Sequence, residues 1–186
     1  MVEDQTFNQQ DFTENRLPHG DYEYCTFINC NFSKSFLNGI NFLECEFIDC
    51  NLSSANITNT AFQDVKFQDC KMLGLHFETC NDFGFSVHFL NGILNHTSFY
   101  QVDLKTSKFE NSKCHEVEFT EADLRQVSLN NCDLQGSTFN NSNLERTDFR
   151  TATNYNIHPE QNKIKGAKFS ADGLAGLLKV YKIVVA

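Results

Sequence analysis

Cysteine is the residue type whose spacing first suggests chemistry, because the eight cysteines of this 186-residue chain are enough for disulfides or a metal centre. Cys30, Cys50 and Cys70 are 20 residues apart, as are Cys25 and Cys45. No CxxC pair occurs, so the spacing does not favour a zinc site. If 20 residues form one coil, stacked side chains lie ~4.8 Å apart, beyond the ~3.8 Å between Cβ atoms that a disulfide prefers. We therefore predict buried, reduced thiols that act as small apolar side chains in a reducing compartment.

The histidines and the sequence motifs give no sign of a catalytic site. There is no glycine-rich phosphate loop, nucleophile elbow or HExxH run. The histidines occupy positions expected to face outward or lie in turns, without a shared partner: His19, His76, His88, His96, His115 and His158. Because catalysis requires groups that converge in a pocket, we expect a noncatalytic protein with no metal and no cofactor.

Acidic side chains remain as candidates for binding. The net charge is -9, which argues against direct contact with nucleic acid or an anionic membrane. Residues 1–80 hold 12 acidic and 4 basic residues, 81–152 hold 10 and 6, and 153–186 hold 2 and 5. The candidate residues for a partner-binding acidic surface are Glu44, Glu46, Asp49, Asp64, Asp69, Glu116, Glu118, Glu121 and Asp123. A solvated surface that keeps the protein soluble would explain any one of them equally well.

A repeat of five residues positions these side chains. Large apolar residues recur at every fifth position from 27 to 77, for example Phe27, Phe32, Leu37 and Phe42. A smaller residue, often cysteine, serine or alanine, lies two positions before each of them. This period fits neither a helix nor a simple strand, and a short repeat sustained over this length indicates a solenoid. Both positions should point inward, because side chains alternate along an extended backbone.

The repeat has definable limits and one interruption. It extends upstream to Phe7, which leaves residues 1–5 as an N-terminal arm that we expect to be frayed. It fails at Asp82, because that register would bury an unpaired carboxylate, and resumes at Phe89 with two residues inserted. We expect a bulge or hinge over residues 81–88 and a repeat region over 6–152.

The segment EADLRQVSLNNCDLQGSTFNNSNLERTDFR resembles the pentapeptide repeat family, whose unit is a small residue, Asp or Asn, Leu or Phe, and two polar residues. The resemblance covers about residues 6–152, although SFLNG places Phe36 where the family prefers Asp or Asn. It implies an all-β solenoid, a right-handed quadrilateral parallel β-helix with one pentapeptide per face. About seven coils would then form a rod ~35 Å long.

Residues 153–186 are expected to cap the rod and to mediate dimerisation. Ser170 can cap a helix that begins near Ala171, and residues 183–185 suggest a short strand. The candidate cap or dimer residues are Leu174, Leu177, Leu178, Tyr181, Ile183 and Val185. Either the apolar stripe covers the last coil of a monomer, or it joins two copies. The tail resembles the C-terminal module of the Qnr, Mfp and microcin-immunity branch, which implies a homodimer.

The same branch implies a function. Its acidic rods mimic DNA and bind type II topoisomerase (DNA gyrase), which protects the enzyme from quinolones or peptide toxins. B-DNA carries about 20 charges over 35 Å, whereas residues 1–152 here carry a net charge of -12. The long loops of many Qnr proteins are absent, and the tail is basic. The alternative is a structural scaffold or adaptor that binds another protein.

The cellular location follows from what the sequence lacks. The N-terminal segment MVEDQTFNQQ has no apolar core of a secretory signal. No stretch approaches the roughly 18 apolar residues of a membrane span. We expect a cytoplasmic protein.

Overall fold

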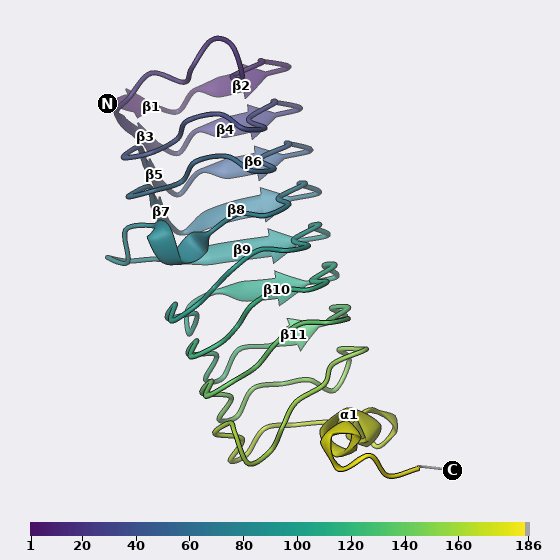
Figure 1. The fold of residues 1–186 in the computed structure, drawn as a ribbon. Helices are drawn as coiled ribbons and strands as arrows, with labels where there is room; N and C mark the ends of the chain where they lie inside the picture. Colours follow the sequence, from purple (N-terminus) through teal and green to yellow (C-terminus); the bar gives the residue numbers. More distant parts are fainter. Residues whose placement is uncertain (185–186) are drawn as a thin grey trace.

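The computed structural model describes residues 1–184 and confirms a parallel β-solenoid with a short C-terminal helix (Figure 1). Short strands stack along the rod as two parallel sheets, one of four strands and one of seven. The four-stranded sheet consists of β1 (Val2–Glu3), β3 (Asp21–Glu23), β5 (Asn41–Leu43) and β7 (Ala61–Gln63). The other consists of β2 (Thr6–Asn8), β4 (Thr26–Ile28), β6 (Glu46–Ile48), β8 (Val65–Gln68), β9 (Val87–Leu90), β10 (Lys108–Glu110) and β11 (Leu129–Asn130).

Stacked aromatic rings fill the interior, as the five-residue spacing predicts. Phe27, Phe47 and Phe67 are fully buried, and their ring centroids are 4.7 Å and 5.0 Å apart. Rings on neighbouring faces of one coil meet edge to face, as Phe42 and Phe47 do at 5.3 Å. Offset-stacked and edge-to-face pairs are the favoured aromatic geometries. The edge-to-face pairs stabilise the faces of one coil against each other, and the stacked pairs stabilise one coil against the next.

The smaller inward residues also satisfy buried backbone carbonyls. The Cys50 thiol donates to the Phe27 carbonyl at 3.3 Å, and the Ser142 hydroxyl donates to the Phe119 carbonyl at 2.7 Å. The position therefore suits a compact side chain, and the cysteines, serines and threonines found there can also donate one hydrogen bond. All eight cysteines are free thiols, and only Cys80 is not fully buried.

Burial keeps seven of the thiols away from reagents in solvent, which gives a testable expectation. Burial raises the pKa of the Cys45 thiol to about 12, and the reactive species is the thiolate. In the native protein at pH 8, Ellman's reagent should modify the seven buried cysteines only after global unfolding, and Cys80 should react first. Full reaction of the native protein within minutes, at the rate seen in guanidinium, would contradict this packing.

The corners of the coils use left-handed backbone. The residue two positions after most inward apolar residues has a positive φ, for example Glu44 (φ 50°) and Asp49 (φ 53°). Asn and Asp tolerate this conformation best, and they occupy many of the corners. The side chains of many corner residues therefore project into solvent, and several of them, such as Glu44 and Asp49, are charged.

The expected interruption is a local bulge. β8 and β9 remain paired, with Phe67 opposite Phe89, so the two extra residues are absorbed before β9. A 3-10 turn, η1 (Phe77–Thr79), precedes the bulge. Asp82 and Phe83 are exposed, and Phe85 fills the inward position instead. The carboxylate thus avoids the core, as the sequence indicates.

The N-terminal segment differs from expectation. Residues 1–5 were predicted to fray, but β1 pairs with β3, with Val2 opposite Tyr22. The backbone N–H of Asp4 also donates to the Glu23 carbonyl at 3.1 Å. Val2 lies 20 residues before Tyr22 in the repeat register, so the first coil starts there and its backbone is satisfied by the next coil.

The repeat also continues beyond residue 152. Asp148 pairs with Lys168, and the rings of Phe149 and Phe169 stack at 5.2 Å. A helical segment then follows as η2 (Asp172–Leu174), α1 (Ala175–Leu178) and η3 (Lys179–Tyr181). The Ser170 hydroxyl accepts the Gly173 N–H at 3.1 Å, which confirms the predicted cap.

The predicted terminal strand is not present in the part of it that the structure describes. Ile183 and Val184 have no regular secondary structure, and Val185 lies outside the described residues. A strand needs a neighbour to pair with, and none of the coils within residues 1–184 pairs with Ile183 or Val184. No helix within residues 1–184 is long and apolar enough to cross a bilayer.

Candidate acidic binding surface

Two columns of carboxylates follow neighbouring corners of the rod. Glu44 and Asp64 occupy the same corner on successive coils, and so do Asp49 and Asp69. All four are exposed, and none forms a salt bridge within the described residues. Asp69 accepts a hydrogen bond from the Asn91 amide at 2.9 Å, which leaves its charge intact. These four residues offer negative charge that no basic side chain within the described residues pairs.

Among the other predicted carboxylates, Glu46 and Glu116 have a basic or histidine partner, whereas Glu118 and Glu121 contact neutral groups. Lys66 lies opposite Glu46 in the β6–β8 pairing, with 3.8 Å between Nζ and Oε1. Glu116 contacts His96 at 3.2 Å, and Glu121 accepts from Gln101 at 2.6 Å. Glu118 is exposed and approaches the Ser98 hydroxyl at 3.4 Å. The second cluster is therefore more engaged with the protein itself than the first.

Asp123 is neutralised by a neighbour two residues away. Arg125 donates to both of its carboxylate oxygens, at 2.9 Å from Nε to Oδ1 and 2.6 Å from Nη2 to Oδ2. Partial burial by itself raises the pKa of Asp123, but these hydrogen bonds and the guanidinium charge outweigh it and lower the pKa. A bidentate pair of this kind contributes little net charge to a binding surface.

The structure adds acidic residues that sequence reasoning assigned to a frayed arm or left unplaced. Glu3 pairs with Glu23, and Asp4 has the same positive φ as Glu44 and Asp64. We call Glu3, Asp4, Glu23, Glu44 and Asp64 the acidic edge. The 20-residue spacing of Val2 and Tyr22 was the signal that could have placed the first two.

The exposed Tyr24 shares this corner. The carboxylate of Glu44 raises the pKa of the Tyr24 phenol.

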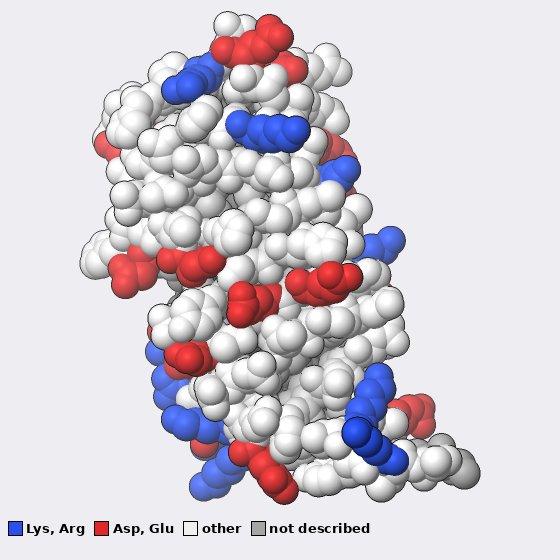
Figure 2. Space-filling model, viewed as in Figure 1, with Lys and Arg blue, Asp and Glu red and all other residues white. Residues whose placement is uncertain are grey.

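A hollow of ≈480 Å³ interrupts this edge at the bulge. Its lining includes Glu44, Asp64, Asp82 and Asp103, with Lys105 as its single basic residue. Lys105 is already paired with Asp103 at 2.8 Å. Red side chains also gather across the middle of the face shown in Figure 2. The middle of the rod therefore presents concave, negatively charged surface.

The predicted cap or dimer residues divide into two groups. Leu177 packs against the core, and Leu178 is half-buried. Leu174, Tyr181 and Ile183 are each about half exposed. The helix also packs against the last coil through Gly176, which contacts Tyr155. Only part of the predicted apolar stripe therefore faces the last coil.

Four of the six histidines each contact one carboxylate. His76, His88, His96 and His115 lie within 3.2 Å of Glu78, Glu110, Glu116 and Asp133, respectively. No group of three or more potential metal ligands occurs within residues 1–184.

Comparison with solved structures shows the same architecture elsewhere. A trypsin-treated variant of QnrB1, a plasmid-mediated fluoroquinolone resistance protein, is 20% identical with a TM-score of 0.50 over 100% of this chain and 99% of that one. HetL, a pentapeptide repeat protein involved in heterocyst differentiation regulation from Nostoc sp. strain PCC 7120, is 15% identical with a TM-score of 0.51, over 91% and 86% of the two chains. At these identities the likeness shows the fold alone. No curated protein sequence matches this chain.

The model of the family described as pentapeptide repeat region matches residues 20–82 and 85–158. The gap between the two matches falls on the bulge, where Phe83 and Gly84 lie outside the repeat. The matched residues cover well over half of the sequence and most of the interior of the solenoid. This chain belongs to the pentapeptide repeat family.

Proposed function

We propose that this protein is a noncatalytic binding rod whose acidic edge, together with Asp49 and Asp69, docks on a basic protein surface. The observation that carries the proposal is the stacking of unpaired carboxylates on successive coils, with Glu44 above Asp64 and Asp49 above Asp69. Repeating charges along a rod resemble the regularly spaced phosphates of DNA. The partner we propose is the DNA-binding surface of a type II topoisomerase such as DNA gyrase. Binding there would protect the enzyme from quinolones or peptide toxins.

The net charge of the rod, compared with that of DNA, indicates how it would bind its partner. Residues 1–152 carry a net charge of -12, below the ~20 charges of B-DNA over a similar length. Several of these charges are internally paired, as at Asp123. The surface should therefore act chiefly by steering association, with an affinity that falls as salt rises.

The test is supercoiling by purified gyrase, with and without ciprofloxacin, at two salt concentrations. The unmodified protein should restore supercoiling in the presence of ciprofloxacin, which we call rescue. The variant Glu44→Gln, Asp49→Asn, Asp64→Asn, Asp69→Asn should lose most of this rescue, because it removes four unpaired carboxylates. We expect an affinity at least about tenfold weaker, since charged contacts are each worth about 1 kcal/mol or more at an interface.

The matched control changes net charge equally but elsewhere: Asp11→Asn, Glu14→Gln, Glu145→Gln, Asp172→Asn. It should retain rescue. Equal losses in both variants would show that only overall charge matters. Absence of gyrase binding at micromolar wild-type protein would reject the topoisomerase partner.

A second candidate function is that of a scaffold or adaptor for another protein. The observation that favours it is apolar exposure at the C-terminal end, where Leu174, Tyr181, Ile183 and Val184 are 47–92% exposed. Such a group is suited to a homodimer or to a different partner. This function would be supported if the protein dimerises, if Leu174→Ser and Ile183→Ser abolish the dimer, and if gyrase binding is absent.

A further inference from the structure

The bulge opens a pair of hollows beside the acidic edge. A second hollow of ≈400 Å³ shares three lining residues, Asp82, Phe85 and Asp103, with the hollow of ≈480 Å³ described above. Asp82 is exposed and forms no salt bridge within the described residues. Phe85 adds apolar surface between the two carboxylates in sequence. Negative charge beside apolar surface suits a long cationic side chain, which buries its stem while its head stays polar.

Hydrogen bonds hold the bulge in a fixed shape. The Gln63 amide donates to the Phe83 carbonyl at 3.0 Å, and the Phe83 N–H donates to Oδ1 of Asn81 at 3.0 Å. The Thr106 hydroxyl donates to the Phe85 carbonyl at 3.1 Å. The hollows are therefore formed before any partner arrives, and less free energy is spent on ordering them during binding.

Asp103 occupies a position that holds a guanidinium group on later coils. It pairs with Asp123 of the next coil, whose two carboxylate oxygens are bound by Arg125. Asp148, which also directly precedes an inward apolar residue, is bound by Arg150 at 3.0 Å from Nε to Oδ1 and 2.7 Å from Nη2 to Oδ2. The side chains of Asp123 and Asp148 are only 24% and 21% exposed. This position of the repeat thus fits the planar, two-pronged guanidinium group.

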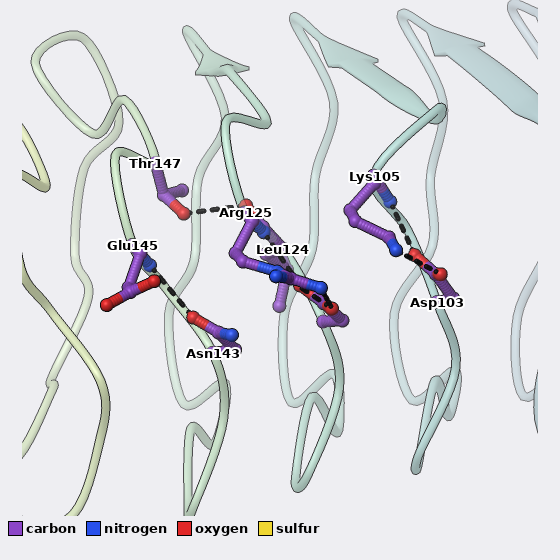
Figure 3. A network of polar contacts seen from close by, with 8 residues as sticks. Asp103, Lys105, Leu124, Arg125, Asn143, Glu145 and Thr147 are labelled. Atoms are coloured by element: carbon purple, nitrogen blue, oxygen red, sulfur yellow. Dashed lines mark hydrogen bonds and ion pairs between the residues drawn. The ribbon is translucent and has the colours of Figure 1, made fainter.

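Lys105 covers Asp103 less completely. Its Nζ lies 2.8 Å from Oδ2 of Asp103, and Lys105 and Arg125 extend in the same direction from successive coils (Figure 3). Oδ1 of Asp103 accepts the backbone N–H of Lys105 at 3.1 Å. The Asp103 side chain remains 60% exposed, because one ammonium group does not span both oxygens as a guanidinium does. Asp103 therefore keeps an open carboxylate at the edge of both hollows.

We propose that the bulge is the docking point for one arginine side chain of the partner protein, which replaces Lys105 on Asp103 and lies over Phe85, with Asp82 as a second carboxylate. The inference rests on the proposed docking of the rod on a basic protein surface, and it names the residue type that the rod anchors. Charge complementarity favours this occupant: within residues 1–184, Lys105 is the only basic residue that lines either hollow.

The experiment is a nitrogen–proton NMR titration of the full chain with blocked glycyl-arginyl-glycine at constant ionic strength. The amide signals of Phe85 and Lys105 should shift in a saturable way. Asp103→Asn should weaken the apparent affinity about tenfold, the value of one charged hydrogen bond. Asparagine fits this position, since Asn143 accepts the Glu145 N–H at 3.3 Å (Figure 3). Lys105→Gln should tighten binding about threefold, because it removes a competing exposed ion pair.

The matched controls change the same charges elsewhere. Asp11 is an exposed carboxylate that accepts the Thr13 N–H at 2.9 Å, as Asp103 accepts that of Lys105, but it lies on the first coil. Lys34 is an exposed corner cation. Asp11→Asn and Lys34→Gln should leave the titration unchanged. Effects equal to those at the bulge would reduce the site to general charge screening and overturn the proposal.

Two further outcomes separate this site from the choice of partner. Blocked glycyl-lysyl-glycine should bind more weakly than the arginine peptide, and equal binding would overturn the preference for arginine. Saturable binding of the arginine peptide without rescue of gyrase would support the arginine site and reject the topoisomerase. Rescue of gyrase without peptide-induced shifts at Phe85 and Lys105 would overturn the arginine site and leave the topoisomerase as the partner.

Discussion

Replacing Phe67 by alanine is expected to lower the free energy of unfolding by about 3–5 kcal/mol, the cost of truncating a buried phenylalanine. Its ring lies between those of Phe47 and Phe89, with centroids 5.0 Å and 5.6 Å away, and meets Phe62 edge to face at 5.6 Å. The side chain is fully buried in the middle of the rod. A solenoid is stabilised by contacts between neighbouring coils, so this cavity weakens the junction of its two halves.

Guanidinium denaturation followed by circular dichroism measures this loss. The matched control is Phe83→Ala, because Phe83 is 77% exposed on the bulge. That substitution should change stability by less than ~0.5 kcal/mol. If both variants lost the same stability, the aromatic column could not be the main source of cohesion between coils.

The second large effect is expected from Gly176→Ala, which should undock the C-terminal helical segment. A Cβ at this position would lie 2.6 Å from both Cδ2 and the backbone oxygen of Tyr155. The Gly176 carbonyl also accepts the Ile157 N–H at 3.0 Å. Backbone atoms cannot move aside as a flexible side chain can, so we expect a cost of about 1–3 kcal/mol.

Limited trypsin digestion provides the measurement, because undocking should speed cleavage after Lys179 and Lys182. Ala175→Ser is the control, since Ala175 is the exposed neighbour of Gly176 in α1. Its digestion should match that of the unmodified protein. Unchanged digestion of Gly176→Ala would mean that the helix is not held against Tyr155.

Local repetition explains why much of the fold follows from sequence. A large inward apolar residue at every fifth position, with a compact residue such as Cys50 two positions before the next one in its row, places similar contacts on successive coils. Each coil contacts chiefly the next, so the interior column repeats wherever the spacing repeats. Asp82 marked the interruption because a carboxylate cannot enter that column unpaired.

The candidate binding surface was predictable in position but not in net charge. The spacing placed Glu44 above Asp64, and the structure shows both exposed. It did not reveal that Asp123 is neutralised by Arg125 two residues away. Whether such a pair forms depends on the direction of the side chains at a corner, which one-dimensional spacing does not specify.

The ends of the rod were decided by tertiary structure. The five-residue pattern specified the repeated interior, since every inner coil has a coil on each side with the same residues at the same positions. Within residues 1–184 the last coil has no coil after it, so the docking of Gly176 on Tyr155 depends on a neighbour that the repeat does not supply, whereas Val2 pairs with Tyr22 in the repeat register.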